Sequence, residues 1–265
     1  MMYRFPQRLS LVFLLFTVSA TSLVFAPPAA SAAREDPQFD ATTDSMRRET
    51  QWVVRRLEQY HYSRKSISQI DFDAFLVNFV SDLDYNRIYL LQEDINAFDY
   101  RFGDGKLRGW LTRGDLYPAF QIYKQYRERA LTRIDWVFDR LEAGFDFSTD
   151  ERYVLDRSEA EWPADREKAD ALWERRLKYE LLNELLPRID EAMEEIEAEE
   201  PVDGASETIA DASDVTPYDI LSRADFAEEI EESKENVRRR YERWRKNLLD
   251  IEPEYVQERF LTALT

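Results

Sequence analysis

One stretch of the chain repeats apolar residues at every third or fourth position, which places them along one side of a long helix. The repeat follows Asp115, a residue suited to start a helix, and Gly144 lies just past its end, where a left-handed backbone costs little. Only 6 of the 265 residues are glycine, and charged residues alternate with apolar ones elsewhere too. The sequence therefore predicts an all-α fold. The stripe consists of Leu116, Phe120, Tyr123, Ala130, Ile134, Val137 and Leu141.

The same pattern places further helices on both sides of this stretch. A Gly103-Asp104-Gly105 turn precedes it, and Pro187 is expected to kink or end the helix that follows it. In the first helix, Met46, Val53 and Leu57 fall near one face. We therefore predict a multi-helix domain. Its expected helices cover Asp44–Tyr60, Asp71–Leu83, Gln92–Tyr100, Asp115–Leu141, Asp165–Leu186, Ala224–Leu249 and Glu254–Thr265.

Residues 187–223 differ in composition from the helical segments on either side. They turn acidic from Asp190 to Glu200, and Pro201–Pro217 is rich in Asp, Ser, Ala and Thr with few large apolar residues. Such a stretch has little apolar surface to bury, so we predict an acidic flexible insertion. The helical domain then covers residues 33–186 and resumes over residues 224–265.

The N-terminus has the pattern of a secretory signal peptide. Arg4 and Arg8 come before or at the edge of an uncharged apolar run, Leu9–Phe25, and Ala30-Ser31-Ala32 has the small-x-small form of a cleavage site. We predict that residues 1–32 are removed on export and leave a mature chain without a membrane segment. The alternative is a tethered scaffold that keeps Leu9–Phe25 as an uncleaved anchor.

Charge and residue content exclude several classes of function. The formal net charge is −18, whereas phosphate binding needs a basic face, so we expect no nucleic-acid partner. The absence of cysteine excludes thiol catalysis and cysteine-ligated metals. No serine lies in G-x-S-x-G and no S-x-x-K occurs, so these serine-protease signatures are missing. We assign no catalytic, cofactor-binding or metal-binding residue and expect no cofactor.

The residues that invite a chemical role have simpler interpretations. His61 is the one histidine and has no partner signal, so we interpret it as a turn residue packed between tyrosines. Asp71 and Asp73 lack the glycine and glutamate of a calcium loop and are better explained by helix capping. The aromatic content of 14% is explained mainly by core packing, and part of it suits a groove for an apolar tail or partner helix.

One basic cluster lies beside an aromatic residue. Arg238–Arg240 is followed by Trp244 and Arg245-Lys246, an arrangement that nucleic-acid-binding surfaces use for charge and stacking. Because the chain is strongly acidic, we interpret the cluster as a solvated helix face with Trp244 packed inward. Its arginines are expected to pair with Asp190–Glu200 or Glu228–Glu232, at about 0–1 kcal/mol for each pair.

The block Tyr153–Leu182 is unusual, with two tryptophans and a proline leading into a charged amphipathic helix. Other short motifs come before and after it. The motif residues are Tyr60-His61-Tyr62; Leu83-Asp84, Tyr89-Leu90, Asp94-Ile95 and Phe98; Asp156-Arg157, Trp162-Pro163, Leu172-Trp173, Lys178 and Leu181; Arg239-Arg240-Tyr241; and Tyr255–Thr265. In this order, they resemble the N-terminal region of bacterial tail-specific, or carboxyl-terminal-processing, serine/lysine proteases. The resemblance spans residues 40–265.

The resemblance implies a part of the protease that does not cut. In this family an Asp-Pro-His segment, a PDZ domain, the catalytic serine and the catalytic lysine lie beyond the matched region. The chain stops at Thr265, so we expect a chain truncated before its catalytic parts and not an enzyme by itself. Without those neighbours, Val256, Phe260 and Leu264 of the last helix are expected to lie partly uncovered.

By resemblance, the chain is expected to work in the periplasm, where it helps to present substrates or adaptors for carboxyl-terminal processing. The expected partners are protein substrates or a lipoprotein adaptor, and the PDZ-protease core if the chain continues. The alternative is a stand-alone exported interaction module that binds a protease, an adaptor or substrate tails in trans.

Overall fold

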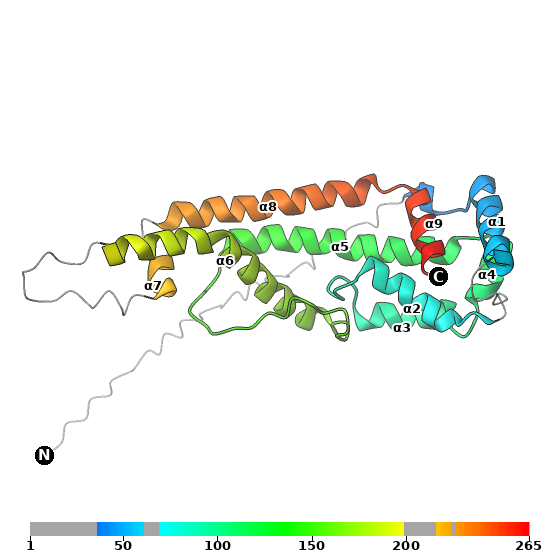
Figure 1. Ribbon diagram of the computed structural model, residues 1–265, viewed down its shortest axis with the longest axis horizontal. Helices are drawn as coiled ribbons and strands as arrows, with labels where there is room; N and C mark the ends of the chain where they lie inside the picture. Colours follow the sequence, from blue (N-terminus) through cyan, green and yellow to red (C-terminus); the bar gives the residue numbers. More distant parts are fainter. Residues whose placement is uncertain (1–35, 61–68, 199–215, 224–225, 265) are drawn as a thin grey trace, which may run out of the picture. The chain divides into compact units, whose positions relative to one another are not determined.

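The computed structural model describes residues 36–60, 69–198, 216–223 and 226–264 (Figure 1). All regular structure in these ranges is helical, which confirms the predicted all-α fold. The predicted signal peptide, His61 and the central part of the predicted insertion lie outside them. The elements are the 3-10 helix Pro37–Phe39 and the α-helices α1 (Asp44–Tyr60), α2 (Phe72–Leu83), α3 (Gln92–Phe102), α4 (Leu107–Arg113), α5 (Tyr117–Ala143), α6 (Arg166–Ala198), α7 (Pro217–Leu221), α8 (Ala227–Asp250) and α9 (Pro253–Thr262).

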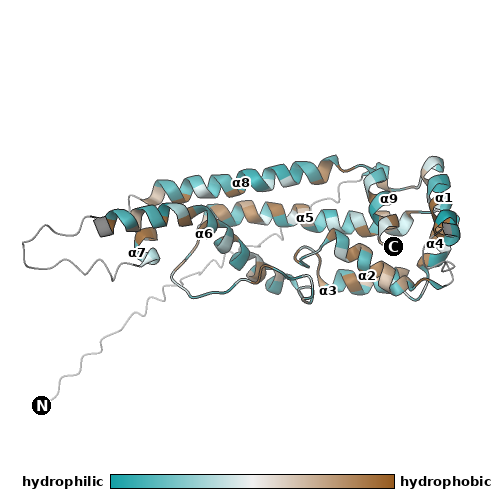
Figure 2. Ribbon diagram, viewed as in Figure 1, coloured by the Kyte–Doolittle hydropathy of each residue, from teal (hydrophilic) through white to brown (hydrophobic). Residues whose placement is uncertain are grey.

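The long helices α5, α6 and α8 pack on one another around an aromatic centre. Helix α8 lies beside α5 and also contacts α6 (Figure 1). Trp173 of α6 is fully buried, with its ring centre 6.0 Å from that of Tyr241 and 5.3 Å from that of Tyr89. The visible face of α8 is largely hydrophilic (Figure 2), as expected for a helix that turns Val237 and Leu248 inward.

The stripe predicted for α5 is buried along its whole length, since each of its residues is at most 1% exposed. The helix begins at Tyr117, and the side chain of Asp115 accepts a hydrogen bond from the Tyr117 backbone N–H at 3.1 Å. Gly144 follows the last helical residue with a φ of 79°. The prediction from spacing alone is therefore confirmed for this helix.

The last helix, α9, is packed into the core. Val256 and Phe260 are fully buried, and the Phe260 ring centre lies 4.8 Å from that of Phe75 and 5.0 Å from that of Phe79. The expectation of partly uncovered residues is wrong for Val256 and Phe260, because α1, α2 and α5 of the same chain contact the helix. It holds for Leu264, which is half-buried.

Helix α6 continues through Pro187 to Ala198, so the expected end near Leu186 is wrong. Figure 1 shows a bend within α6, the usual way in which a helix accommodates a proline. Residues 187–198 and Pro217–Leu221 are thus helical at the two ends of the predicted flexible insertion. Burial explains the correction, because a second apolar cluster draws on both segments. This cluster consists of Leu185, Ile189, Ile220 and Phe226.

Helix α4 follows the predicted Gly103–Gly105 turn and has no counterpart among the expected helices. It has 7 residues, one of them Gly109, so its helical pattern is weak. Tertiary burial stabilises it, since Leu107 and Leu111 are fully buried. The helix ends at Gly114, whose φ of 69° and ψ of 26° are left-handed.

Replacing Gly114 with alanine is expected to lower the free energy of unfolding by about 2 kcal/mol. The left-handed φ disfavours a side chain, and a Cβ atom would lie 2.4 Å from the Arg47 carbonyl oxygen of α1. Thermal unfolding measures the effect. Gly105→Ala is the matched control, because Gly105 has a φ of 72° but open space around the Cβ position. Equal losses in the two variants would show that the contact with Arg47 contributes nothing.

Candidate functional site

The acid of the Leu83-Asp84 motif, Asp84, is the centre of a buried cluster. Asp84 is 2% exposed, and its carboxylate accepts backbone N–H groups of Ile88 at 3.0 Å, Tyr89 at 3.2 Å and Leu90 at 3.0 Å. The indole Nε1–H of Trp162 donates to the same carboxylate at 3.1 Å. Burial raises the pKa of the Asp84 carboxyl, and these donors act in the opposite direction. The carboxylate thus organises the turn after α2.

The Trp162-Pro163 motif closes over that turn. The guanidinium of Arg87 lies 4.5 Å from the centre of the Trp162 ring and donates to the Ala160 carbonyl at 2.6 Å. The backbone N–H of Gln92 donates to the Pro163 carbonyl at 2.9 Å. Two segments far apart in the sequence are therefore joined by a cation–π contact and by side-chain and backbone hydrogen bonds.

Two further motif residues also bind interior partners. The indole Nε1–H of Trp173 donates to the Ile88 carbonyl at 2.8 Å. Asp94 is 6% exposed and accepts the Leu91 N–H at 2.9 Å and the Nε–H of Arg129 at 2.9 Å, which fixes the start of α3 against α5. The motifs thus mark positions that hold the helices together. We call the set Asp84, Arg87, Trp162, Pro163 and Trp173 the signature cluster.

A buried polar network joins α6 to α8 beside this cluster. The Tyr241 hydroxyl donates to Oε1 of Glu180 at 3.0 Å, and Nε–H of Arg176 donates to the same oxygen at 2.8 Å. Burial raises the pKa of Tyr241 well above its usual value, with the nearby Glu180 carboxylate acting in the same direction. The phenol therefore stays protonated as a donor and fixes α6 against α8.

Asp71 has the capping role predicted for it. Its Oδ1 accepts the backbone N–H groups of Asp73 at 3.1 Å and Ala74 at 3.0 Å, at the start of α2. Within the described ranges, no group of three or more His, Cys, Asp or Glu residues is placed to hold a metal ion.

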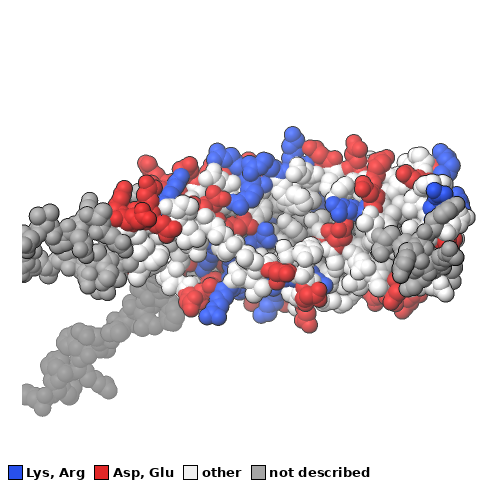
Figure 3. Space-filling model, in the orientation of Figure 1, with Lys and Arg blue, Asp and Glu red and all other residues white. Residues whose placement is uncertain are grey.

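The basic cluster of α8 is an ion-paired helix face, although the expected partners are wrong. Because α8 packs against both α5 and α6, its arginines reach acids on those two helices. Figure 3 shows acidic and basic side chains interspersed on the visible surface. Trp244 is half-buried and packs against the core, as predicted. The pairs are Arg238 with Glu142 at 3.2 Å, Arg240 with Glu184 at 2.7 Å, and Arg245 with Asp135.

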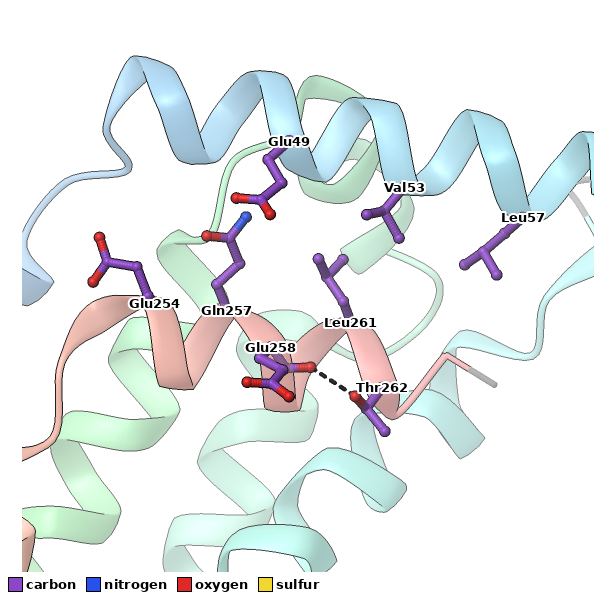
Figure 4. Close-up of a pocket in the computed structure, with 8 residues that line it drawn as sticks. All are labelled: Glu49, Val53, Leu57, Glu254, Gln257, Glu258, Leu261 and Thr262. Carbon is purple, nitrogen blue, oxygen red and sulfur yellow. Dashed lines mark hydrogen bonds between the residues drawn. The ribbon is translucent and has the colours of Figure 1, made fainter.

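An open groove of about 490 Å³ lies between α1 and α9 (Figure 4). Its two walls are fixed to each other by Gln257, which is 3% exposed. The Gln257 side-chain amide donates to the Met46 carbonyl at 3.2 Å and to the Thr50 hydroxyl at 3.1 Å. The groove is therefore a preformed feature of the fold. Its lining residues are Glu49, Val53, Leu57, Glu254, Gln257, Glu258, Leu261 and Thr262.

The sequence indicated the α1 wall only in part. Met46 is buried as its stripe predicts, but Val53 and Leu57 are only half-buried and face the groove. The acidic residues of the groove were not singled out. The sequence does contain one indication of this acid. Glu49, Val53 and Leu57 are four positions apart, so an acidic residue shares a helix face with two apolar ones.

The sequence profile of the tail specific protease N-terminal domain matches residues 53–265 of the chain. The chain belongs to this family. It is also similar to a tail-specific protease of Haemophilus influenzae, with 27% identity over 148 residues. The aligned region covers 56% of this chain and 21% of that relative.

The family match links the signature cluster to the architecture of the tail-specific protease N-terminal domain. Every residue of the cluster lies inside the matched range, and each one contacts other parts of the same domain. The groove between α1 and α9 is the candidate binding surface. Among the described residues, no helix is long and apolar enough to span a membrane.

Proposed function

We propose that this chain is the non-catalytic helical domain through which a periplasmic tail-specific protease captures protein substrates or an adaptor for carboxyl-terminal processing. The observation that carries the non-catalytic part of the proposal is the hydrogen bonding of Asp84 and Asp94, the two buried motif acids. Both accept several hydrogen bonds from within the domain, so they support its architecture and are poorly placed to act on a substrate.

The hydroxyl groups support the same proposal. Catalysis by serine needs a base within hydrogen-bond reach of the hydroxyl. Three serine hydroxyls bond a partner within four positions in the sequence. They are Ser45 with Thr43, Ser158 with Asp156, and Ser222 with the Tyr218 carbonyl.

The proposal is tested with the purified chain and a dye-labelled substrate protein. This protein is held unfolded by chemical modification and ends in an apolar carboxyl-terminal tail. We expect saturable binding and no cleavage on prolonged incubation, because capture uses shape and packing. The same protein in its folded form is the control and should bind much more weakly. Equal binding of both forms, or cleavage that a substitution in this chain abolishes, would overturn the proposal.

The proposed location has its own test. The pattern of Arg4, Leu9–Phe25 and Ala30-Ser31-Ala32 supports export with cleavage after Ala32. Mass spectrometry of the protein from the periplasmic fraction should give a mature chain that starts at Ala33. A chain that keeps residues 1–32 would favour the tethered scaffold.

A further inference from the structure

The groove between α1 and α9 has an apolar floor. Val53 and Leu57 point into it from α1, and Leu261 points toward them from α9 (Figure 4). All three side chains are half-buried, although the neighbouring Val54, Val256 and Phe260 are buried in the core. The floor is thus apolar surface that the described residues leave partly open to solvent, which is a usual property of an interaction surface.

The groove also carries exposed acids that form no ion pair within the described residues. Glu49 lies on α1, Glu254 and Glu258 lie on α9, and all three are exposed. None forms an ion pair with a cation in the described part of the chain. The adjacent Arg259 pairs instead with Asp82 of α2, at 3.2 Å.

Some acids elsewhere on the described surface are ion-paired. Glu142 and Glu184 are each paired with an arginine of α8. An apolar floor with unpaired carboxylates is complementary to a ligand that combines apolar and cationic side chains. The net charge of −18 favours the approach of such a ligand over that of an acidic one.

Helix geometry indicates the form of that ligand. Two helices that are fixed side by side, here by Gln257 with Met46 and Thr50, offer a groove to a third helix. An amphipathic helix enters such a groove with apolar residues at positions i, i+3, i+4 and i+7. We propose that the α1–α9 groove binds a cationic amphipathic helix of a partner protein, with its apolar face on Val53, Leu57 and Leu261 and its lysines or arginines toward the groove acids.

This inference rests on the proposed capture function and names the chemistry of one partner. The probe is a fluorescein-labelled helical peptide of leucine, alanine and lysine, with leucine at i, i+3, i+4 and i+7 and lysine beside that stripe. The matched peptide has glutamate in place of each lysine. Fluorescence anisotropy with the full purified chain at low salt should show binding of the lysine peptide at least about tenfold tighter than that of the glutamate peptide.

Two pairs of variants locate the binding. The double charge reversal Glu49→Lys with Glu258→Lys should weaken binding about tenfold or more. The control is Glu242→Lys, since Glu242 is an exposed acid of α8 outside the groove. It should change binding by less than about twofold per charge. Leu57→Gln should weaken binding severalfold. Val77→Gln is its control and should leave binding unchanged, because the Val77 side chain is 49% exposed on α2, outside the groove. Circular dichroism and the thermal midpoint show that each variant is folded.

Three outcomes overturn the proposal. Equal weakening by Glu242→Lys and the groove reversal would mean that diffuse charge attracts the peptide. Failure of the lysine peptide to bind would exclude this partner chemistry. Concentration-dependent association of the chain that Leu57→Gln abolishes would make a second copy the occupant.

The proposed function and the groove proposal can fail separately. If the chain binds the unfolded protein and all groove variants bind it equally well, while the lysine peptide does not bind, the groove proposal alone is wrong. If the peptide binds in the groove but the unfolded protein does not bind at all, capture of unfolded substrates is wrong and the groove remains a docking site.

Discussion

Replacing Asp84 with alanine is expected to lower the free energy of unfolding by about 3–5 kcal/mol. The substitution leaves the N–H groups of Ile88, Tyr89 and Leu90 and the indole of Trp162 without their shared acceptor. These donors surround a side chain that is 2% exposed, so water cannot readily replace the carboxylate. The turn after α2 and the Trp162-Pro163 block should loosen together, because one side chain holds both.

Urea unfolding followed by circular dichroism measures the loss, and an unchanged m-value shows that the same transition is observed. Asp82→Ala is the matched control, since Asp82 lies two positions away and makes a surface pair with Arg259. It should cost less than about 1 kcal/mol. Asp84→Asn should be intermediate, because the amide keeps one acceptor oxygen and turns a donor toward the other N–H groups. A loss from Asp84→Ala no larger than the control's would refute the structural role of the signature cluster.

The helices that sequence predicted well are those in which the pattern and the capping residues agree. The apolar stripe of α5 and the capping by Asp71 at α2 are local features, and the structure confirms both. Helix α4 and the continuation of α6 past Pro187 depend on burial of Leu111 and Ile189 against other segments. No local pattern contains those contacts, so spacing and propensity could not reveal them.

The candidate site likewise combines residues that the sequence identifies with contacts that only the folded structure shows. The resemblance singled out Asp84 and Trp162, but their contact joins residues 78 positions apart, which a single sequence does not show. It is the folded chain that turns two separate motifs into one cluster. The groove depends even more on tertiary structure, because Glu49 and Glu258 become its acids only when α9 returns to pack against α1.

Phe260 packs α9 against α2. Its side chain is fully buried, with its ring centre 4.8 Å from that of Phe75 and 5.0 Å from that of Phe79. Phe260→Ala should lower the free energy of unfolding by about 3–5 kcal/mol, because it removes these ring contacts and leaves a cavity between α9 and α2. Urea unfolding measures the loss.

The matched control is Tyr255→Ala, an aromatic truncation on the same helix. Tyr255 is 39% exposed, and its hydroxyl accepts a hydrogen bond from Arg259 at 3.0 Å, so its loss should cost about 1 kcal/mol or less. Phe260→Ala should also weaken binding of the lysine peptide, although every groove acid and the Gln257 bonds to α1 remain, because α9 loses its packing on α2. If Phe260→Ala lowers the stability but keeps full binding, the groove does not need α9 to be fixed in place. If Phe260→Ala and Tyr255→Ala have equal stability, α9 is not part of the core.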